Sequence, residues 1–192
     1  MSLCVLTPIK DHVAGPHHVS MVALACEFGS SMHHRTTWLS SHLAEARNVL
    51  LVEALKTNAD RILFADDDIA FTVDDVRALL AVEEDVVAGA YTTRTPRGVV
   101  AGDPIEGGAK RGALLPMRCV GMGLTMLSRA CVERMVEAHP MTAFEFRAEG
   151  GRVHGEDEVF CQKWRAMGGA VWMHTGVRVG HVGPHVYTMG AE

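Results

Sequence analysis

The hydrophobic positions along the chain follow two different spacings. Short, largely apolar segments occur at 3–6, 61–65 and 85–91, and segments of this length next to turn residues are typical of buried strands. Over 16–28 and 43–55, apolar residues recur instead at the three- and four-residue intervals of a helix. Because strand-like and helix-like segments alternate, we predict an α/β domain.

The same patterns continue through the rest of the chain. Thr72 and Asp75 have the spacing of a capping box, so we predict a helix over 72–80. Further helices are predicted at 128–137 and 156–167, and further strands at 36–39, 119–127, 171–173 and 177–179. Residues 92–117 are rich in Gly, Pro and Arg, which predicts a long loop, and 180–192 form a Gly/Pro/His-rich tail.

Composition narrows the class of protein. The 192 residues suit one domain, and 48% hydrophobic with 21% charged residues is an ordinary globular balance. A net charge of −5 excludes a globally basic nucleic-acid-binding surface, although a local basic strip is compatible with it. The sequence predicts no membrane span and no signal peptide. Five cysteines without a CxxC pair favour a reducing, cytoplasmic setting over a disulfide framework or a zinc knuckle.

The strongest candidate for chemistry is Asp66-Asp67-Asp68, which directly follows the predicted strand at 61–65. Ligands of open α/β sheets bind at the carboxyl ends of strands. Like charges ~4 Å apart repel by about 4 kcal/mol at an effective dielectric near 20, so adjacent carboxylates favour a cation. Oxygen ligands suit Mg²⁺ or Mn²⁺. The alternative is a solvated turn in which one aspartate caps the next helix.

A second acidic group, Glu156-Asp157-Glu158, stands at the start of a predicted helix. The helix dipole favours ionised carboxylates there, which keeps one of them ready to accept a proton at neutral pH. The alternative is that these acids only stabilise the helix start.

Histidines are the remaining metal-ligand candidates. His181 or His185, in a Gly/Pro-rich segment, could add a nitrogen to a metal that carboxylates already hold; the alternative is an exposed loop histidine. Two further pairs have no acid or cysteine pattern around them and are interpreted as surface or loop residues: His17 with His18, and His33 with His34.

Two other features admit two interpretations each. Arg47, in Ala46-Arg47-Asn48, could bind phosphate with its planar guanidinium, or it could be a surface residue of an amphipathic helix. Gly121-Met122-Gly123 is either a strand bulge or a place where the backbone approaches a ligand closely. The sequence contains no GxxxxGK[ST], GxGxxG or GxSxG motif.

The order of these motifs resembles that of GT-A fold glycosyltransferases, most of all the family-2-like group with its short bacterial and phage-type members. The matching segments, in order, are Leu6-Thr7-Pro8, Ala46-Arg47-Asn48, 63–68, 120–123, 156–161 and Val179-Gly180-His181. The resemblance implies a single Rossmann-like GT-A domain over 1–192, with a mostly parallel central sheet flanked by helices. It also implies a nucleotide-sugar-binding half at 1–91 and an acceptor and catalytic half at 92–192.

The resemblance further implies a metal-dependent, inverting transfer of a sugar from a nucleotide-diphosphate sugar to an acceptor hydroxyl, as in hexosyltransferases. The residues it places at the donor are Thr7 beside the base, Arg47, Asp66 and Asp67. Mn²⁺ or Mg²⁺ is expected on Asp66, Asp68 and His181. Asp157 matches the catalytic base, with Glu156 beside it as the second choice. The acidic residue with which family members recognise the nucleotide base is missing from 38–42, so the identity of the nucleotide base stays open.

The acceptor is the least defined part of this prediction. Five basic residues in 92–118 could contact a polyanion such as a hydroxylated DNA base, or they could belong to an ordinary solvated loop while a glycan is the acceptor: Arg94, Arg97, Lys110, Arg111 and Arg118. Two alternative functions remain at this point. One is a hydrolase or another transferase that acts on nucleotide-diphosphate sugars, and the other is a non-catalytic module that only binds them.

Overall fold

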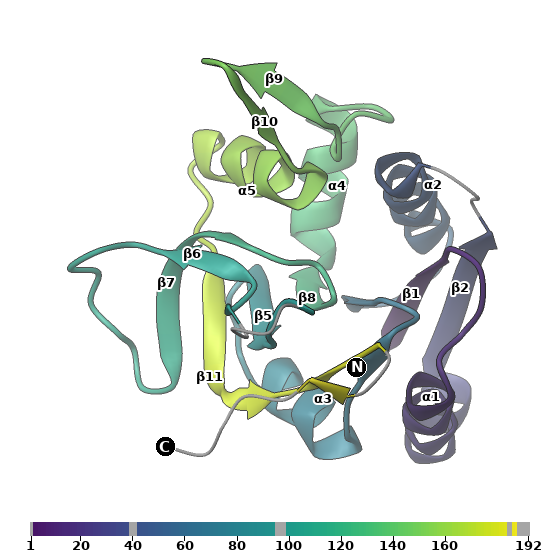
Figure 1. Cartoon of the computed structure of the whole chain (residues 1–192). Helices are drawn as coiled ribbons and strands as arrows, with labels where there is room; N and C mark the ends of the chain where they lie inside the picture. Colours follow the sequence, from purple (N-terminus) through teal and green to yellow (C-terminus); the bar gives the residue numbers. More distant parts are fainter. Residues whose placement is uncertain (1, 39–41, 95–98, 184–185, 188–192) are drawn as a thin grey trace.

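The computed structural model of the chain describes residues 2–38, 42–94, 99–183 and 186–187. An eight-stranded sheet runs through the molecule in the order β2-β1-β3-β8-β5-β11-β7-β6 (Figure 1). Its strands are β1 (Leu3–Ile9), β2 (Met32–Trp38), β3 (Arg61–Ala65), β5 (Val86–Ala90), β6 (Gly102–Pro104), β7 (Leu114–Val120), β8 (Leu124–Ser128) and β11 (Trp172–Arg178).

Two smaller sheets flank this one. A three-stranded sheet joins β4 (Ile69–Ala70), β12 (Gly180–Val182) and β13 (Val186–Tyr187), and a hairpin pairs β9 (Arg147–Glu149) with β10 (Arg152–His154). The helices are α1 (Gly15–Phe28), α2 (Leu43–Leu55), α3 (Val73–Leu80), α4 (Arg129–Ala138) and α5 (Glu156–Ala166), with a 3-10 turn η1 (Gly29–Ser31) after α1.

The strand directions confirm the expected mostly parallel sheet. β1 pairs in parallel with β2 and β3, and β5 pairs in parallel with β11. β8 is antiparallel to both β3 and β5, so those two strands share one direction. Within the eight-stranded sheet that the described residues form, only β7 and β8 run against the others.

Helices cover both faces of the sheet. Apolar residues of α2, α4 and α5 pack in one core cluster, and those of α1 and α3 pack in the other, in agreement with the two helical layers in Figure 1. β1 lies between the layers, because Cys4 and Leu6 face the first cluster while Leu3 and Val5 face the second. Burial on both faces explains why the central strands are continuous apolar runs in the sequence.

The predicted helices are all present, and two of their starts are capped as expected. The Thr72 hydroxyl accepts a hydrogen bond from the Asp75 amide, and the Asp75 carboxylate accepts one from the Thr72 amide. The Ser128 hydroxyl caps α4 by accepting from the Cys131 amide.

Several strand predictions need correction. The strand expected at 36–39 begins at Met32 and carries a polar face, which hid its first half; Leu39 lies outside the described residues. The segment 119–127 is not one strand but the end of β7 followed by β8, which are separated in the sheet by β5 and β11, and 92–117 contains β6 and the start of β7. The strands expected at 171–173 and 177–179 are one strand, β11, while the expected tail contains β12 and β13.

Candidate active site

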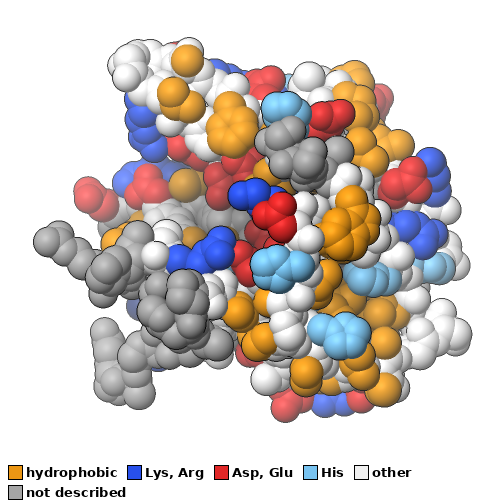
Figure 2. Space-filling view, turned by 45° about the vertical axis from the view of Figure 1, so that its right-hand side comes forward, with side chains coloured by type: hydrophobic (Ala, Val, Ile, Leu, Met, Phe, Trp, Pro, Cys, Tyr) orange, Lys and Arg blue, Asp and Glu red, His pale blue; other side chains and the backbone are white. Residues whose placement is uncertain are grey.

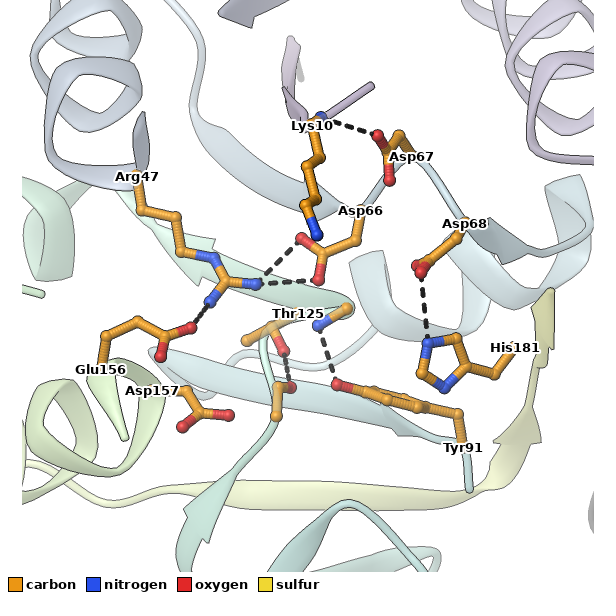
Figure 3. A network of polar contacts seen from close by, with 12 residues as sticks. Lys10, Arg47, Asp66, Asp67, Asp68, Tyr91, Thr125, Glu156, Asp157 and His181 are labelled. Carbon is orange, nitrogen blue, oxygen red and sulfur yellow. Dashed lines mark hydrogen bonds and ion pairs between the residues drawn. The ribbon is translucent and has the colours of Figure 1, made fainter. Parts of the chain in front are cut away.

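Most of the predicted site residues line one cavity of about 450 Å³ at the carboxyl ends of β1, β3 and β5. Figure 2 shows acidic and basic side chains gathered near the middle of one face of the molecule, and Figure 3 shows the side chains of the site. The charged residues and histidines that line the cavity are Lys10, His42, Arg47, Asp66, Asp67, Asp68, Arg94, Glu156, Asp157 and His181.

Backbone hydrogen bonds hold the three aspartates in a fixed turn after β3. The Asp66 amide donates to the Gly123 carbonyl of the β7–β8 connection (2.9 Å), and the Ala14 amide donates to the Asp67 carbonyl (2.9 Å). The Val182 amide of β12 donates to the Asp68 carbonyl (2.7 Å). Three separate segments therefore fix the turn, and they set a different direction for each carboxylate.

Asp66 is directed toward Arg47 of α2 (Figure 3). The Arg47 Nη2 atom donates to both carboxylate oxygens of Asp66, at 2.8 and 3.0 Å, and Nη1 donates to Glu156. The Arg47 side chain is only 3% exposed, so the interpretation as a surface arginine is wrong. Burial alone would lower the pKa of Arg47, but Asp66 and Glu156 raise it. Arg47 thus joins the two acidic groups of the sequence from inside the protein.

Asp67 is held on the side of β1. Its Oδ2 atom accepts a hydrogen bond from the Lys10 amide (3.0 Å), and in Figure 3 the Lys10 side chain points toward Asp66. Burial raises the pKa of Asp67, and the charges of Asp68 and Asp66 add to this rise, while the Lys10 amide opposes it.

Asp68 faces His181 of β12. The His181 Nε2 atom lies 3.4 Å from the Asp68 Oδ2 atom, and Nδ1 donates to the Thr92 carbonyl (2.9 Å). The Arg94 Nη2 atom lies 2.8 Å from the same Oδ2 atom. Burial alone would raise the pKa of Asp68, but His181 and then Arg94 lower it. Asp68 is therefore an ionised carboxylate with a cation already beside it.

The ligand pattern fits a divalent ion held by two side chains rather than three. Histidines that bind metals commonly donate their second ring N–H to a carbonyl, as Nδ1 of His181 does, which leaves Nε2 facing the site. The Arg94 guanidinium beside Asp68 shows that this position attracts positive charge. Asp66 is engaged by Arg47, and no group of three potential metal ligands occurs among the described residues. Of the three predicted ligands, Asp68 and His181 are therefore the two that could hold an ion between them.

Tyr91 packs against His181 on one side and against two glycines on the other. The Tyr91 ring packs edge-on against the His181 ring, 5.5 Å between centroids. Its hydroxyl accepts from the Gly123 amide (3.1 Å), and a Cβ on Gly121 would lie 2.1 Å from the same oxygen. The glycine segment is therefore not a strand bulge but the connection between β7 and β8, its backbone approaches the Tyr91 side chain, and Met122 between the two glycines lines the cavity.

Glu156 and Asp157 begin α5, as predicted, and have different surroundings. Glu156 is paired with Arg47, whereas Asp157 forms no ion pair with any described residue; its Oδ1 accepts from the Glu158 amide (2.8 Å). Burial raises the pKa of Asp157, Glu156 raises it further, and Arg47 opposes both. Of the two carboxylates, Asp157 is the one available to take a proton from a molecule in the cavity.

Thr7 lies in the core rather than in the cavity wall. It is 1% exposed, and its hydroxyl lies 3.1 Å from Nε2 of His34. The cavity wall instead includes Lys10 and Tyr91, which the sequence reasoning did not assign to the site, and Arg94, which it considered only as a contact for the acceptor. Each lies at or just after the carboxyl end of a central strand, and that position was the signal that could have found them.

The interpretation of the histidine pairs as surface or loop residues is wrong for His17. It is 1% exposed on α1, and its Nδ1 atom lies 2.9 Å from the Ile69 carbonyl, just after the three aspartates. The face of α1 that packs against β4 buries it. Of the other three, His18 on α1 and His34 on β2 are exposed surface residues, as interpreted, and His33 on β2 is half-buried. His185 lies outside the described residues.

Three of the five basic residues of 92–118 are paired with separate carboxylates. Arg94 pairs with Asp68, Arg111 with Glu84 and Arg118 with Asp103. The Arg111 guanidinium also lies over the Trp172 ring, 4.6 Å from its centroid. Arg97 lies outside the described residues. Each of these three arginines is thus paired with a different carboxylate.

The fold is that of GT-A glycosyltransferases: a mixed α/β domain with a large, mostly parallel sheet and the site at the carboxyl ends of its strands. Comparison with solved structures supports this. The structure of A197 from STIV matches with a TM-score of 0.65 at 16% identity, over 100% of this chain and 96% of that one.

Two glycosyltransferase structures match as well. The catalytic domain of Drosophila beta1,4galactosyltransferase 7, in complex with xylobiose, matches with a TM-score of 0.58 at 16% identity, over 100% of this chain and 76% of that one. GalNAc-T7 with UDP, GalNAc and Mn²⁺ matches with a TM-score of 0.63 at 10% identity, over 95% and 43%. The sequence matches no protein-family model and no curated protein. None of the helices among the described residues is long and apolar enough to span a membrane.

Proposed function

We propose that the protein is a metal-dependent glycosyltransferase that moves a sugar from a nucleotide-diphosphate sugar to an acceptor hydroxyl. One observation carries this proposal. Asp68, His181 and Asp157 come from three distant parts of the chain and line the same cavity. The GT-A fold, which solved structures bound to UDP and Mn²⁺ share, adds support.

The charge of the cavity favours a divalent ion. Five carboxylates and three basic side chains line it, a formal excess of two negative charges: Asp66, Asp67, Asp68, Glu156 and Asp157 against Lys10, Arg47 and Arg94. A diphosphate would add further negative charge. A Mn²⁺ or Mg²⁺ ion on Asp68 and His181 offsets this repulsion and, when bound, supplies Lewis-acid stabilisation of the departing diphosphate.

The protein's own residues would divide the remaining work. Asp157 accepts the proton of the acceptor hydroxyl while that oxygen bonds to the anomeric carbon and the bond from this carbon to the diphosphate oxygen breaks. Direct displacement inverts the configuration of the sugar. A raised pKa makes Asp157 a stronger base than an ordinary aspartate. Arg47 is a positioning residue that fixes Asp66 and Glu156 on either side.

Two finer points belong to the proposal. A glycan is the favoured acceptor over a hydroxylated DNA base, since Arg94, Arg111 and Arg118 are paired with carboxylates rather than gathered for a polyanion. A cytoplasmic location is favoured because all five cysteines are free.

A thermal-shift panel of nucleotide-diphosphate sugars, with and without Mn²⁺, tests the donor site. A donor at 100 times its Kd stabilises the protein by about 2.7 kcal/mol. We expect this shift to require Mn²⁺ and to disappear in Asp68→Asn, whereas the control Asp74→Asn, at an 87% exposed side chain, keeps it. A shift that persists in Asp68→Asn would refute the metal site.

Turnover separates the proposal from its alternatives. We expect Asp157→Asn to bind the donor as the wild type does and to lose transfer, with a rate lower by about 10²–10⁴-fold. Donor binding without turnover by the wild type, with every acceptor tried, would indicate a binding module. Release of free sugar as fast with water alone as with any acceptor would indicate a hydrolase.

A further inference from the structure

Arg94 occupies the position where the divalent ion is expected. We infer that Arg94 holds the place of this ion in the donor-free protein and moves to the diphosphate of the donor when the ion binds. This inference rests on the proposed function and adds to it a residue that neither the motifs nor the fold assign.

The contacts show a direct competition for one atom. The Oδ2 atom of Asp68 lies 2.8 Å from the Nη2 atom of Arg94 and 3.4 Å from the Nε2 atom of His181. A metal ion on Asp68 and His181 would need the same oxygen. It would also repel the guanidinium beside it, because like charges at this separation are strongly unfavourable. Metal binding at this oxygen therefore competes with Arg94 and favours its release.

The contacts of Arg94 are weak enough to break when a metal ion binds, whereas those of Arg47 are not. The Arg94 side chain is 48% exposed, and its second contact is a 3.4 Å hydrogen bond to the Val182 carbonyl. Exposed pairs of this kind typically change an equilibrium by about fivefold or less. The Arg47 side chain is 3% exposed and holds two carboxylates at once. The cavity thus combines one fixed arginine with one that can be released.

The released side chain has one suitable new partner. Arg94 lines the cavity beside Asp68 and His181, so a diphosphate bound to the ion would lie within the reach of its side chain. A guanidinium can bind two phosphate oxygens at once, and such charge-assisted hydrogen bonds are among the stronger polar contacts in proteins. The same residue would then oppose the metal alone and favour the metal together with a diphosphate.

Arg94→Gln tests this by two binding measurements with opposite expected signs. Calorimetric titration with Mn²⁺ alone should give a Kd lower than that of the wild type by about two- to fivefold, because the competing cation is gone. Titration with UDP, GDP, ADP and CDP at saturating Mn²⁺ should give a Kd for the bound nucleotide that is higher by about tenfold or more.

Arg118→Gln is the matched control. Arg118 is also paired with an aspartate and is similarly exposed, at 45%, but it does not line the cavity. This variant makes the same change in net charge and should alter neither Kd. A purely structural role of Arg94 would weaken both kinds of binding together.

The outcomes distinguish this inference from the proposed function. If the wild type binds Mn²⁺ through Asp68 but Arg94→Gln shifts the two affinities in the same direction, or leaves either one unchanged, the role of Arg94 is refuted and the metal site stands. If neither protein binds Mn²⁺ or Mn²⁺-dependent nucleotide, both the proposed function and the role of Arg94 are refuted.

Discussion

Replacing Arg47 by methionine should strongly destabilise the protein, although arginine is a residue type that usually lies on the surface. The substitution keeps an unbranched, helix-compatible side chain and removes the charge that Asp66 and Glu156 share. Two carboxylates would then face each other without a partner. Breaking a buried ion pair by removing one member typically costs about 3–5 kcal/mol, because the other charge stays buried.

The exposures of the three side chains set the magnitude. Arg47 is 3% exposed, Glu156 10% and Asp66 22%, so water can reach Asp66 and lessen its share of the cost. We therefore expect a loss of ~3–4 kcal/mol in the free energy of unfolding at pH 7. For a domain of this size that is a fall in Tm of about 6–16 °C.

Chemical denaturation at pH 7 measures this loss, with Arg77→Met as the control. Arg77 makes the same kind of ion pair with Glu27, but its side chain is 53% exposed, and exposed pairs contribute about 0.2–1 kcal/mol. Adding Glu156→Gln to Arg47→Met should restore part of the stability, because one of the two unpaired charges is removed. A loss below 1 kcal/mol in Arg47→Met, or no recovery in the double variant, would refute the bridging role of Arg47.

The remaining predictions concern the base and the glycine pair. Asp157→Asn should raise the free energy of unfolding at pH 7, because a carboxyl whose pKa is raised by folding destabilises the folded protein once it is ionised. This gain should vanish below the pKa of the carboxyl in the unfolded chain, which is about 4. A gain that stays constant with pH would contradict the assignment. For the same reason, transfer by the wild type should fall on the acid side with a midpoint above the ordinary aspartate pKa, which a pH–rate profile measures. Gly121→Ala should cost about 1–3 kcal/mol and weaken Mn²⁺ binding, because its Cβ would lie 2.1 Å from the Tyr91 hydroxyl. Gly15→Ala, which meets no atom within 4 Å, should lower neither quantity, and equal losses in the two variants would contradict this reasoning.

The errors of the sequence reading share a physical cause. The first half of β2 was missed because it carries polar residues, and its strand structure comes from pairing with β1 rather than from apolar burial on both faces. His17 was misplaced because nothing local distinguishes a histidine that faces solvent from one that packs under β4. The strand-bulge interpretation of the glycine segment failed because its partner, Tyr91, lies on another part of the chain.

The sequence by itself determined the helices and most of the strands, and it determined the strand and helix ends at which the candidate site residues lie. Apolar runs, helical spacing and capping residues are local, so they placed Asp66–Asp68 after a buried strand and Glu156 with Asp157 at a helix start. Only the tertiary structure decided how these groups meet. Arg47 bridges to a carboxylate 109 residues away, and the three adjacent aspartates separate toward Arg47, Lys10 and His181. Contacts of this kind depend on where distant elements pack, and no local pattern in the chain encodes that.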